Sequence, residues 1–245
     1  MMENSVILRL LRKMPTDARI SAIRALTEML TVEENEAGCA KAEISSILVA
    51  ALKELSKSEN EDERFVAADN PYTPAEVLTD MSKDKDRRIR WRVAKNPNAS
   101  PEDLTELLKD RNPATRAEAA KNPNTPAEEL IKLLKCKDQG LQMFVAFNHN
   151  TPAEALTELS KNKSPYIRAI VADNPNTPAE DLIKLSKDKY TKVRASVANN
   201  PNTPIEVLIK LSKDKEARVR WLARMNLKNN PNTPSEVLAE LPKDE

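Results

Sequence analysis

Side chains that commonly do chemistry are scarce in this chain. It contains one histidine, His149, and two cysteines, Cys39 and Cys136, which lie too far apart for a paired-ligand or redox motif. No HExxH or GxSxG motif occurs, and two glycines leave no phosphate-binding loop. Carboxylates are abundant, but they recur at regular intervals and therefore read as scaffold. We expect no catalytic residue, no metal site and no cofactor, and we predict that the protein is not an enzyme.

Arginine and aspartate recur in matching positions. Arginines share one column, and an aspartate precedes four of them by six residues; where that aspartate is replaced by Cys136, the arginine is replaced by Gln142. The paired loss predicts a series of Asp–Arg hydrogen bonds within or between units, because a partly buried guanidinium needs a carboxylate. An arginine stripe that faces a ligand is the alternative. The arginines of this column are Arg64, Arg90, Arg116, Arg168, Arg194 and Arg220.

A repeat of 26 residues must position these side chains. Asn-Pro pairs begin at 70, 96, 122, 174, 200 and 230, with Asn148-His149 in the missing place, and a Thr-Pro or Ser-Pro pair follows each one. Leucines keep the same register from Leu52 onward. The sequence predicts six full units, a degenerate unit before them and a truncated unit after them, over residues 52–245.

The residue pattern of each unit predicts two short helices. In Thr177-Pro178-Ala179-Glu180 the threonine is expected to cap the first helix, with proline at its first position and glutamate closing a capping box. Val193 and Val197 lie four residues apart on one face of the second helix, which Asn200-Pro201 ends. Neither helix is long enough to be stable alone, so neighbouring units must stack into an all-α solenoid.

The repeated pattern V-R-x-x-V-A-x-N-P-N-T-P-x-E-x-L-x-x-L-S-K-D, clearest at 193–214, resembles the leucine-rich repeat variant (LRV) family. The resemblance implies alternating α and 3₁₀ helices in a right-handed superhelix without strands, whereas the residues themselves are compatible with either an α-helix or a 3₁₀ helix as the second helix of each repeat. Family members can carry an N-terminal cysteine cluster that binds an iron–sulfur centre. The N-terminal region here offers Cys39 alone, so that cluster is not expected.

Residues 1–51 form a separate segment, predicted to be an N-terminal helical cap. Helical runs at 5–13, 16–30 and 42–57 are separated by Pro15 and by the acidic turn at 33–36. A cap with a polar outer face would shield the first repeat, and a partner-docking role is the alternative. The segment lacks the features of a signal peptide, no stretch is apolar enough for a membrane span, and the cysteine usage suits a reducing interior. We expect a cytoplasmic protein that does not bind membranes.

Charged residues form two further sets of columns. Glutamate recurs near the start of each first helix, from Glu76 to Glu236. Cations recur around the connector, the short segment that joins the two helices of a repeat, from Lys83 and Lys85 onward. Helix capping and the helix dipole explain both, and the balanced net charge of +1 argues against extensive phosphate neutralisation. A nucleic-acid-binding solenoid that uses these Lys/Arg ridges is the alternative function.

The irregular unit at 136–150 is the best candidate binding site. It places Phe147 in a column that is otherwise polar, next to His149, and Phe144 in a mixed column that also holds Ile170. An apolar cluster on a polar row is typical of a contact surface, although local repacking around the irregular turn is an alternative. Trp91 and Arg92 form a second candidate pair, because Trp–Arg pairs anchor interfaces or stack on bases; space filling near one end of the stack is the alternative.

These features predict a non-catalytic binding scaffold whose repeat surface recognises a protein partner. We expect a monomer or a weak homo-oligomer. The candidate partner-binding residues are Phe144, Phe147, His149, Ile170, Trp91 and Arg92.

Overall fold

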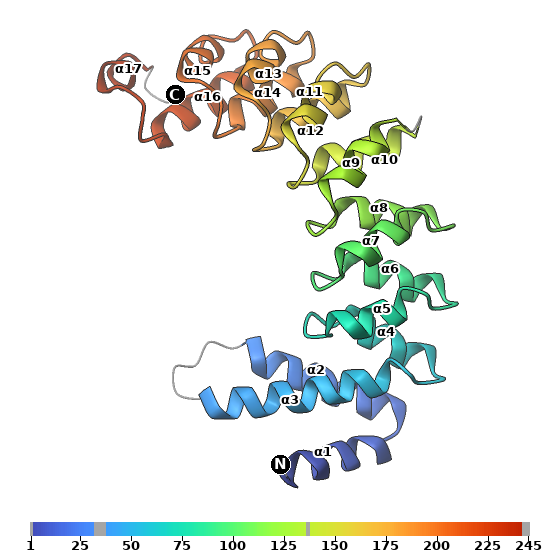
Figure 1. Ribbon diagram of the computed structural model, residues 1–245. Coiled ribbons are helices and arrows are strands. Elements are labelled where there is room, and N and C mark those ends of the chain that lie inside the picture. The colour runs from blue at the N-terminus through green and yellow to red at the C-terminus, as the bar shows by residue number, and fades with distance from the viewer. Residues whose placement is uncertain (1, 32–37, 136–137, 242–245) are drawn as a thin grey trace. The chain divides into compact units, whose positions relative to one another are not determined.

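The chain is helical throughout the part that the structure describes. The structure, a computed structural model, describes residues 2–31, 38–135 and 138–241 (Figure 1). Over these ranges it contains 17 α-helices and neither β-strand nor 3₁₀ helix. The all-α prediction is confirmed, and the second helix of each repeat is an α-helix rather than the 3₁₀ helix that the resemblance implied. The acidic turn at 33–36, Cys136, Lys137 and Lys243 lie outside the described residues.

The helices alternate between two kinds after the first three. Helices α1 (Met2–Lys13), α2 (Thr16–Thr31) and α3 (Gly38–Leu55) precede the repeats. The first helices of the repeats are α5 (Ala75–Met81), α7 (Pro101–Leu107), α9 (Ala127–Leu134), α11 (Ala153–Leu159), α13 (Ala179–Leu185), α15 (Ile205–Leu211) and α17 (Ser235–Glu240). The second helices are α4 (Glu61–Asp69), α6 (Arg87–Lys95), α8 (Pro113–Lys121), α10 (Gln139–Phe147), α12 (Pro165–Asp173), α14 (Thr191–Asn199) and α16 (Ala217–Asn229).

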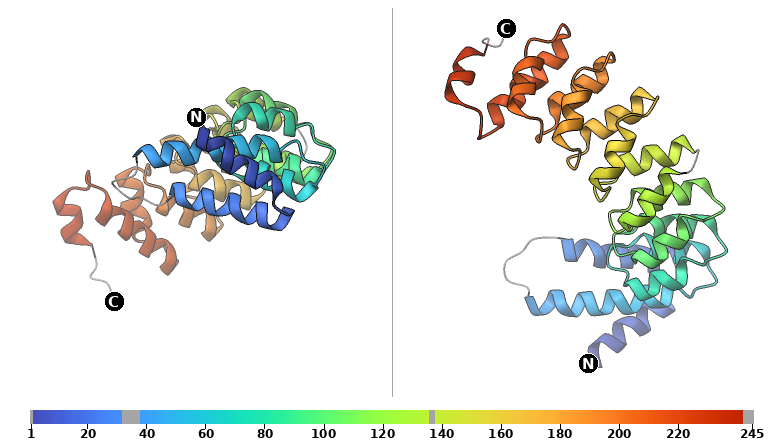
Figure 2. Two further views of the ribbon diagram at one scale, coloured as in Figure 1. Left: turned by 90° about the horizontal axis from the view of Figure 1, so that it is seen from below. Right: turned by 45° about the horizontal axis from the view of Figure 1, so that its top comes forward.

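The helices form two compact units, unit 1 (Met1–Thr125) and unit 2 (Pro126–Glu245). In unit 1 the second helices α4, α6 and α8 stack on one another, and in unit 2 so do α10, α12, α14 and α16. The first helices from α5 to α15 pack against these stacks (Figure 1). At the start of unit 1, α2 and α3 lie side by side and both contact α4 (Figure 2).

The core of each unit is the predicted leucine column. From Leu52 to Leu208 these leucines are fully buried, as the spacing at i and i+3 predicted, because each first helix turns this face toward its second helix; Leu238 of α17 is 39% exposed. The second helices contribute Val193 and Val197, which are fully buried, and their counterparts, which are buried. The fully buried leucines of this column are Leu52, Leu78, Leu104, Leu130, Leu156, Leu182 and Leu208.

Asparagine does more than end the second helix. The side-chain amide of Asn200 is buried and donates to the carbonyl oxygens of Ala172, at 2.7 Å, and Asn174, at 2.9 Å, in the preceding repeat. Its Oδ1 accepts the N–H of Asn202 at 2.9 Å. These bonds satisfy backbone groups at the end of one helix through the side chain of the next repeat. The same paired bonds are made by Asn96, Asn122, Asn174 and Asn226.

The predicted threonine cap is wrong in most repeats. The Thr177 hydroxyl donates to the carbonyl oxygen of Val171 in the preceding helix, and α13 begins after Pro178 with no side-chain cap. The hydroxyl is therefore engaged with a carbonyl in the last turn of α12, which also accepts the main-chain N–H of Asn174 at 3.0 Å. Only at Ser100-Pro101, where the proline is one residue later, does a side chain cap the first helix as predicted: Ser100 Oγ accepts the Asp103 N–H at 3.1 Å.

The last repeat is spaced differently because its second helix is longer. Helix α16 has 13 residues where the other second helices have nine, which accounts for the final spacing of 30 between Asn-Pro pairs. Asn226, inside α16, keeps the 26-residue register and bonds to Ala198 and Asn200. The hydrogen-bonding asparagine is therefore set by the stack and not by the Asn-Pro pair.

Candidate binding surfaces

The arginine column is structural. Arg194 binds Asp214 with Nε–Oδ2 at 2.7 Å and Nη2–Oδ1 at 3.0 Å, and its Nη1 donates to the carbonyl oxygens of Asp188 and Lys189. Its guanidinium thus joins the connector of its own repeat to that of the next. For four of the six arginines the carboxylate partner lies 20 residues later, and the pairs are Arg64–Asp84, Arg90–Asp110, Arg168–Asp188 and Arg194–Asp214. The predicted Asp–Arg series is confirmed.

Gln142, which stands in the arginine column, has a partner other than the one that the sequence indicated. Gln142 pairs with Asn162, whose Nδ2 donates to Gln142 Oε1 at 3.1 Å. Two amides therefore take the places of an arginine and an aspartate in one step of the series. The bond preserves the geometry without charge, and it explains why Asn162 replaces aspartate.

The cationic and acidic ridges lie at the surface. Glu180 and Lys187 are exposed, as are their counterparts in the described repeats, and Asp188 between Lys187 and Lys189 is held by Arg168. The lysines that flank each such aspartate are thus left as the outward charge of the connector. This arrangement agrees with solvated helix ends.

The irregular repeat of unit 2, which contains α10, exposes an aromatic side chain. Phe147, at the end of α10, is 58% exposed, and its ring lies 6.4 Å from that of His149, tilted by 35°. Phe147, His149 and Ile170 line a small cleft of about 110 Å³ with Asp173. The structure therefore brings together three of the candidate residues, in what we call the Phe147 cleft. Phe144 is half-buried on the same helix and is not part of the lining.

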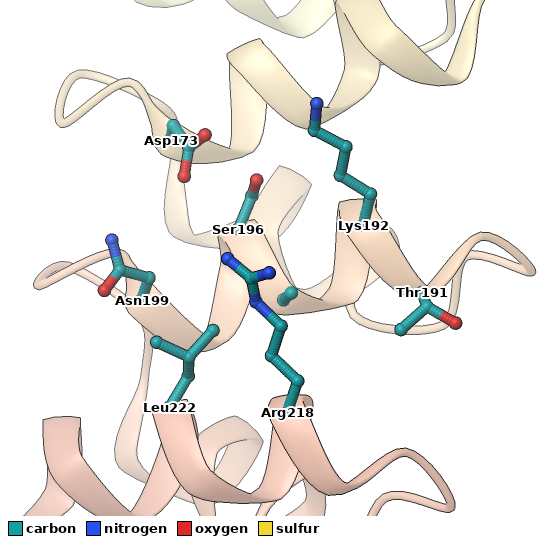
Figure 3. A pocket seen from close by; sticks show the side chains of 8 residues that line it. Asp173, Thr191, Lys192, Ser196, Asn199, Arg218 and Leu222 are labelled. Atoms are coloured by element: carbon teal, nitrogen blue, oxygen red, sulfur yellow. The ribbon is translucent and has the colours of Figure 1, made fainter.

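A larger groove adjoins this cleft. It lies across α12, α14 and α16, has a volume of about 710 Å³, and shares Asp173 with the Phe147 cleft; we call it the Asp173 groove (Figure 3). In Figure 3 the Arg218 side chain extends from α16 toward Ser196, with Lys192 and Asp173 on the facing helices. Its lining residues are Asp173, Thr191, Lys192, Ala195, Ser196, Asn199, Arg218 and Leu222.

The Asp173 groove is lined by more positively charged side chains than negatively charged ones. Asp173 is an exposed residue, but desolvation of its carboxylate by the packing around it raises its pKa above the usual range, although a hydrogen bond from Ser196 and the charge of Lys192 oppose the increase. Within the described ranges, neither Lys192 nor Arg218 forms an ion pair. Sequence reasoning missed this groove, because its residues come from three repeats and none departs strongly from its column.

Trp91 and Arg92 belong to unit 1 and form a second cluster. The Arg92 guanidinium lies over the rings of Phe65, at 4.4 Å, and Trp91, at 4.7 Å, and its Nη1 binds Asp69 at 2.5 Å. Both rings are half-buried. The predicted Trp–Arg pair is therefore a stacked contact within unit 1, separate from the Phe147 cleft of unit 2.

Metal sites and membrane-spanning helices are both absent from the residues that the structure describes. In the described part of the chain, no group of three or more His, Cys, Asp or Glu side chains is arranged to hold a metal ion. None of the described helices combines the length and the apolar character needed to cross a membrane.

Comparison with known proteins identifies the fold. No protein-family model matches the sequence, and no curated protein matches it. Among solved structures, "A leucine-rich repeat variant with a novel repetitive protein structural motif" is similar over 87% of this chain and 88% of that chain, with a TM-score of 0.52 and 23% identity. An engineered protein is similar over 98% of this chain and 81% of its own, with a TM-score of 0.43 and 19% identity. The resemblance read from the repeat is thus confirmed at the level of structure: the chain has the fold of the leucine-rich repeat variant.

Proposed function

We propose that the protein is a non-catalytic scaffold that binds a segment of a partner protein across the second helices of unit 2. The observation that carries the proposal is the exposed Phe147 beside a cleft that continues into the Asp173 groove. Exposed aromatic side chains next to a hollow supply the anchors of protein interfaces. The fold supports this function, because stacked repeats offer extended surfaces without any single pocket.

Charge complementarity defines the partner segment. Lys192 and Arg218 face the groove without ion-pair partners among the described residues, and they outnumber Asp173. An acidic side chain would find a guanidinium or ammonium there, whereas an apolar side chain would cover Phe147 and Ile170. We therefore infer a segment in which a large apolar residue lies close to acidic residues.

A peptide selection tests the proposal. Random peptides displayed on phage are selected on the full chain, and the enriched sequences are synthesised and titrated. We expect apolar residues next to Asp or Glu, and a loss of at least about tenfold in affinity for F147S, as for an interface anchor. The matched control is I183S, which alters an exposed isoleucine of α13 outside the cleft and groove. Equal affinities for the two variants would contradict the proposal, as would enrichment of basic peptides.

We also propose that residues 1–51 cap the stack. The amide of Asn70, the first asparagine of the column, donates to Thr27 Oγ1 of α2 at 2.7 Å, where later asparagines bind the preceding repeat. Arg19 of the same helix donates to Glu63 at 3.0 Å. These bonds replace those of a preceding repeat. In T27V, Asn70 would lose this acceptor, and chemical denaturation should show a loss of about 1 kcal/mol; no loss would argue against capping at this position.

A further inference from the structure

A cleft in unit 1 is bordered by three cations. It lies where the connectors of two consecutive repeats meet, before α6 and α8, and has a volume of about 450 Å³. Lys85, Arg87 and Arg111 line it, and all three are exposed. Arg111 extends over the preceding connector, with Nη2 at 3.5 Å from the carbonyl oxygen of Lys85. We call this hollow the basic cleft; its other lining residues are Asp86, Asn112 and Pro113.

The carboxylates near the basic cleft are already engaged. Asp86 accepts the main-chain N–H of Arg88 at 2.8 Å and binds its guanidinium at 3.0 Å. Asp84 and Asp110, in the two connectors, are each bound by an arginine of the preceding repeat. Lys85, Arg87 and Arg111 form no ion pair within the described ranges. The cleft therefore has excess positive charge available to an external anion.

An aromatic surface continues from the basic cleft. A second hollow of about 440 Å³ is lined by Phe65 and Trp91, and Arg87 and Asn112 line both hollows. Arg92 lies over both rings and is itself bound to Asp69, and these contacts hold the rings in place. The part of the indole that borders the hollow is thus presented on a fixed support beside three cations.

We propose that this surface of unit 1 binds single-stranded nucleic acid, with phosphates at Lys85, Arg87 and Arg111 and a base on Trp91. Cations that follow a backbone beside an aromatic ring are the combination that single strands require, because each base offers a flat face. A duplex buries these faces by stacking. The proposal is independent of the protein partner assigned to unit 2, since it uses other residues.

Tryptophan fluorescence of the full chain gives the first test. In W221F, Trp91 is the only tryptophan, and titration with a deoxythymidine oligonucleotide should quench its emission. Three phosphate contacts predict a slope of about −2 for the logarithm of affinity against that of salt concentration, at about 0.7 per contact. R87A and R111A should each weaken binding and reduce the slope by about 0.7. The proposal would be overturned if the oligonucleotide did not quench the emission, or if its affinity did not depend on salt concentration.

Fluorescence anisotropy of a labelled oligonucleotide separates base stacking from charge. W91A should lower the affinity by about 5-fold to 150-fold, the range expected for one stacked base, whereas W91F should retain most of it. The matched control is W221A, because Trp221 occupies the same column in unit 2 and is 57% exposed. Equal affinities for W91A and W221A would refute the assignment.

Polyglutamate supplies a polyanion without bases. It should bind more weakly than the oligonucleotide and with the same affinity to W91A as to the parent chain. If polyglutamate instead bound as tightly and with the same dependence on Trp91, the surface would be a site for acidic protein segments and the proposal would be wrong. Thermal melts of each variant establish folding, and R87A, which alters an exposed side chain, keeps the test decisive should W91A unfold.

Discussion

Arg90 binds the carboxylate of Asp110, 20 residues further along the chain, with Nε–Oδ2 at 2.6 Å and Nη2–Oδ1 at 3.2 Å. Both side chains are 8% exposed. Arg90 also donates to the carbonyl oxygens of Asp84 and Lys85 in its own repeat. One side chain thus joins two connectors, and the pairing is shared along the stack by arginines that have the same register.

Removing Arg90 should destabilise the protein strongly. R90A leaves Asp110 mostly buried without its cation, and the loss of one partner of a buried pair costs about 3–5 kcal/mol. The matched control is R220A: Arg220 makes the same bonds to carbonyl oxygens but has no ion pair in the described part of the chain. Urea denaturation compares the two variants. Equal losses would show that the carbonyl bonds, rather than the ion pair, carry the effect.

The stability contributed by Asp214 should disappear at low pH. Hydrogen bonds from Arg194 lower the pKa of Asp214 below its ordinary value, despite its burial. A lowered folded-state pKa adds stability that is fully present well above the unfolded value of about 3.9 and is lost as pH falls through the folded value. The difference in unfolding free energy between the parent chain and D214N should be constant near neutral pH and shrink below about pH 5. A constant difference down to pH 2 would contradict this.

The contribution of Asp173 to stability should depend on pH in the opposite direction. Desolvation raises its pKa, so the folded state binds this proton more tightly than the unfolded chain does. Its contribution is fully present below the unfolded pKa and is lost as pH rises through the folded value. D173N should therefore be at least as stable as the parent chain at pH 7, and its relative advantage should vanish under acid conditions. Thermal melts across pH measure both, and a D173N protein that is less stable at pH 7 would refute the expectation.

Asn200 and Asn199 offer a matched pair of neighbours. Asn200 is buried and donates to two carbonyl oxygens of the preceding repeat, whereas Asn199 is exposed. N200D replaces the donor with a carboxylate and leaves both carbonyls without this partner, which should cost about 3 kcal/mol or more. N199D should change stability by about 0.5 kcal/mol or less. Chemical denaturation of both proteins checks this, and similar losses would show that the buried bonds contribute little.

Phe147 should matter little for folding. Its side chain is 58% exposed, so F147S removes little buried apolar area and should alter the free energy of unfolding by about 0.5 kcal/mol or less. I170S is the comparison, because Ile170 lines the same cleft but is half-buried. Thermal melts distinguish the two. A large loss for F147S would identify Phe147 as a packing residue and remove the basis for the proposed contact surface.

Much of the fold could be predicted because it depends on local rules repeated many times. The 26-residue period, the alternation of two short helices and the buried leucine column follow from spacing and from proline placement. The cap of the first helix could not be predicted in the same way. Thr177 has a hydroxyl that serves a cap or a carbonyl equally well, and only the position of Val171 in the folded repeat decides between them.

The candidate sites, too, could be predicted only in part from the sequence. Phe147 stands out in the sequence as an apolar residue in a polar column, and the structure exposes it beside His149. The Asp173 groove could not be predicted, because it joins ordinary residues from successive repeats; for the basic cleft the sequence shows the column that holds Lys85 and Arg111, but not that they meet with Arg87 in one hollow. Spacing along the chain does not reveal which side chains of two connectors meet.

The repeat, the helical class and the existence of an arginine–aspartate series all follow from the order of the residues in the chain. The partners within that series depend on the tertiary structure: Arg64, Arg90, Arg168 and Arg194 each bind the aspartate 20 residues later, and Gln142 pairs with Asn162. The physical reason is that a column specifies which residues recur, whereas stacking brings the connector of the next repeat within reach of the guanidinium. Pairing across repeats therefore depends on how the helices pack, which no single repeat encodes.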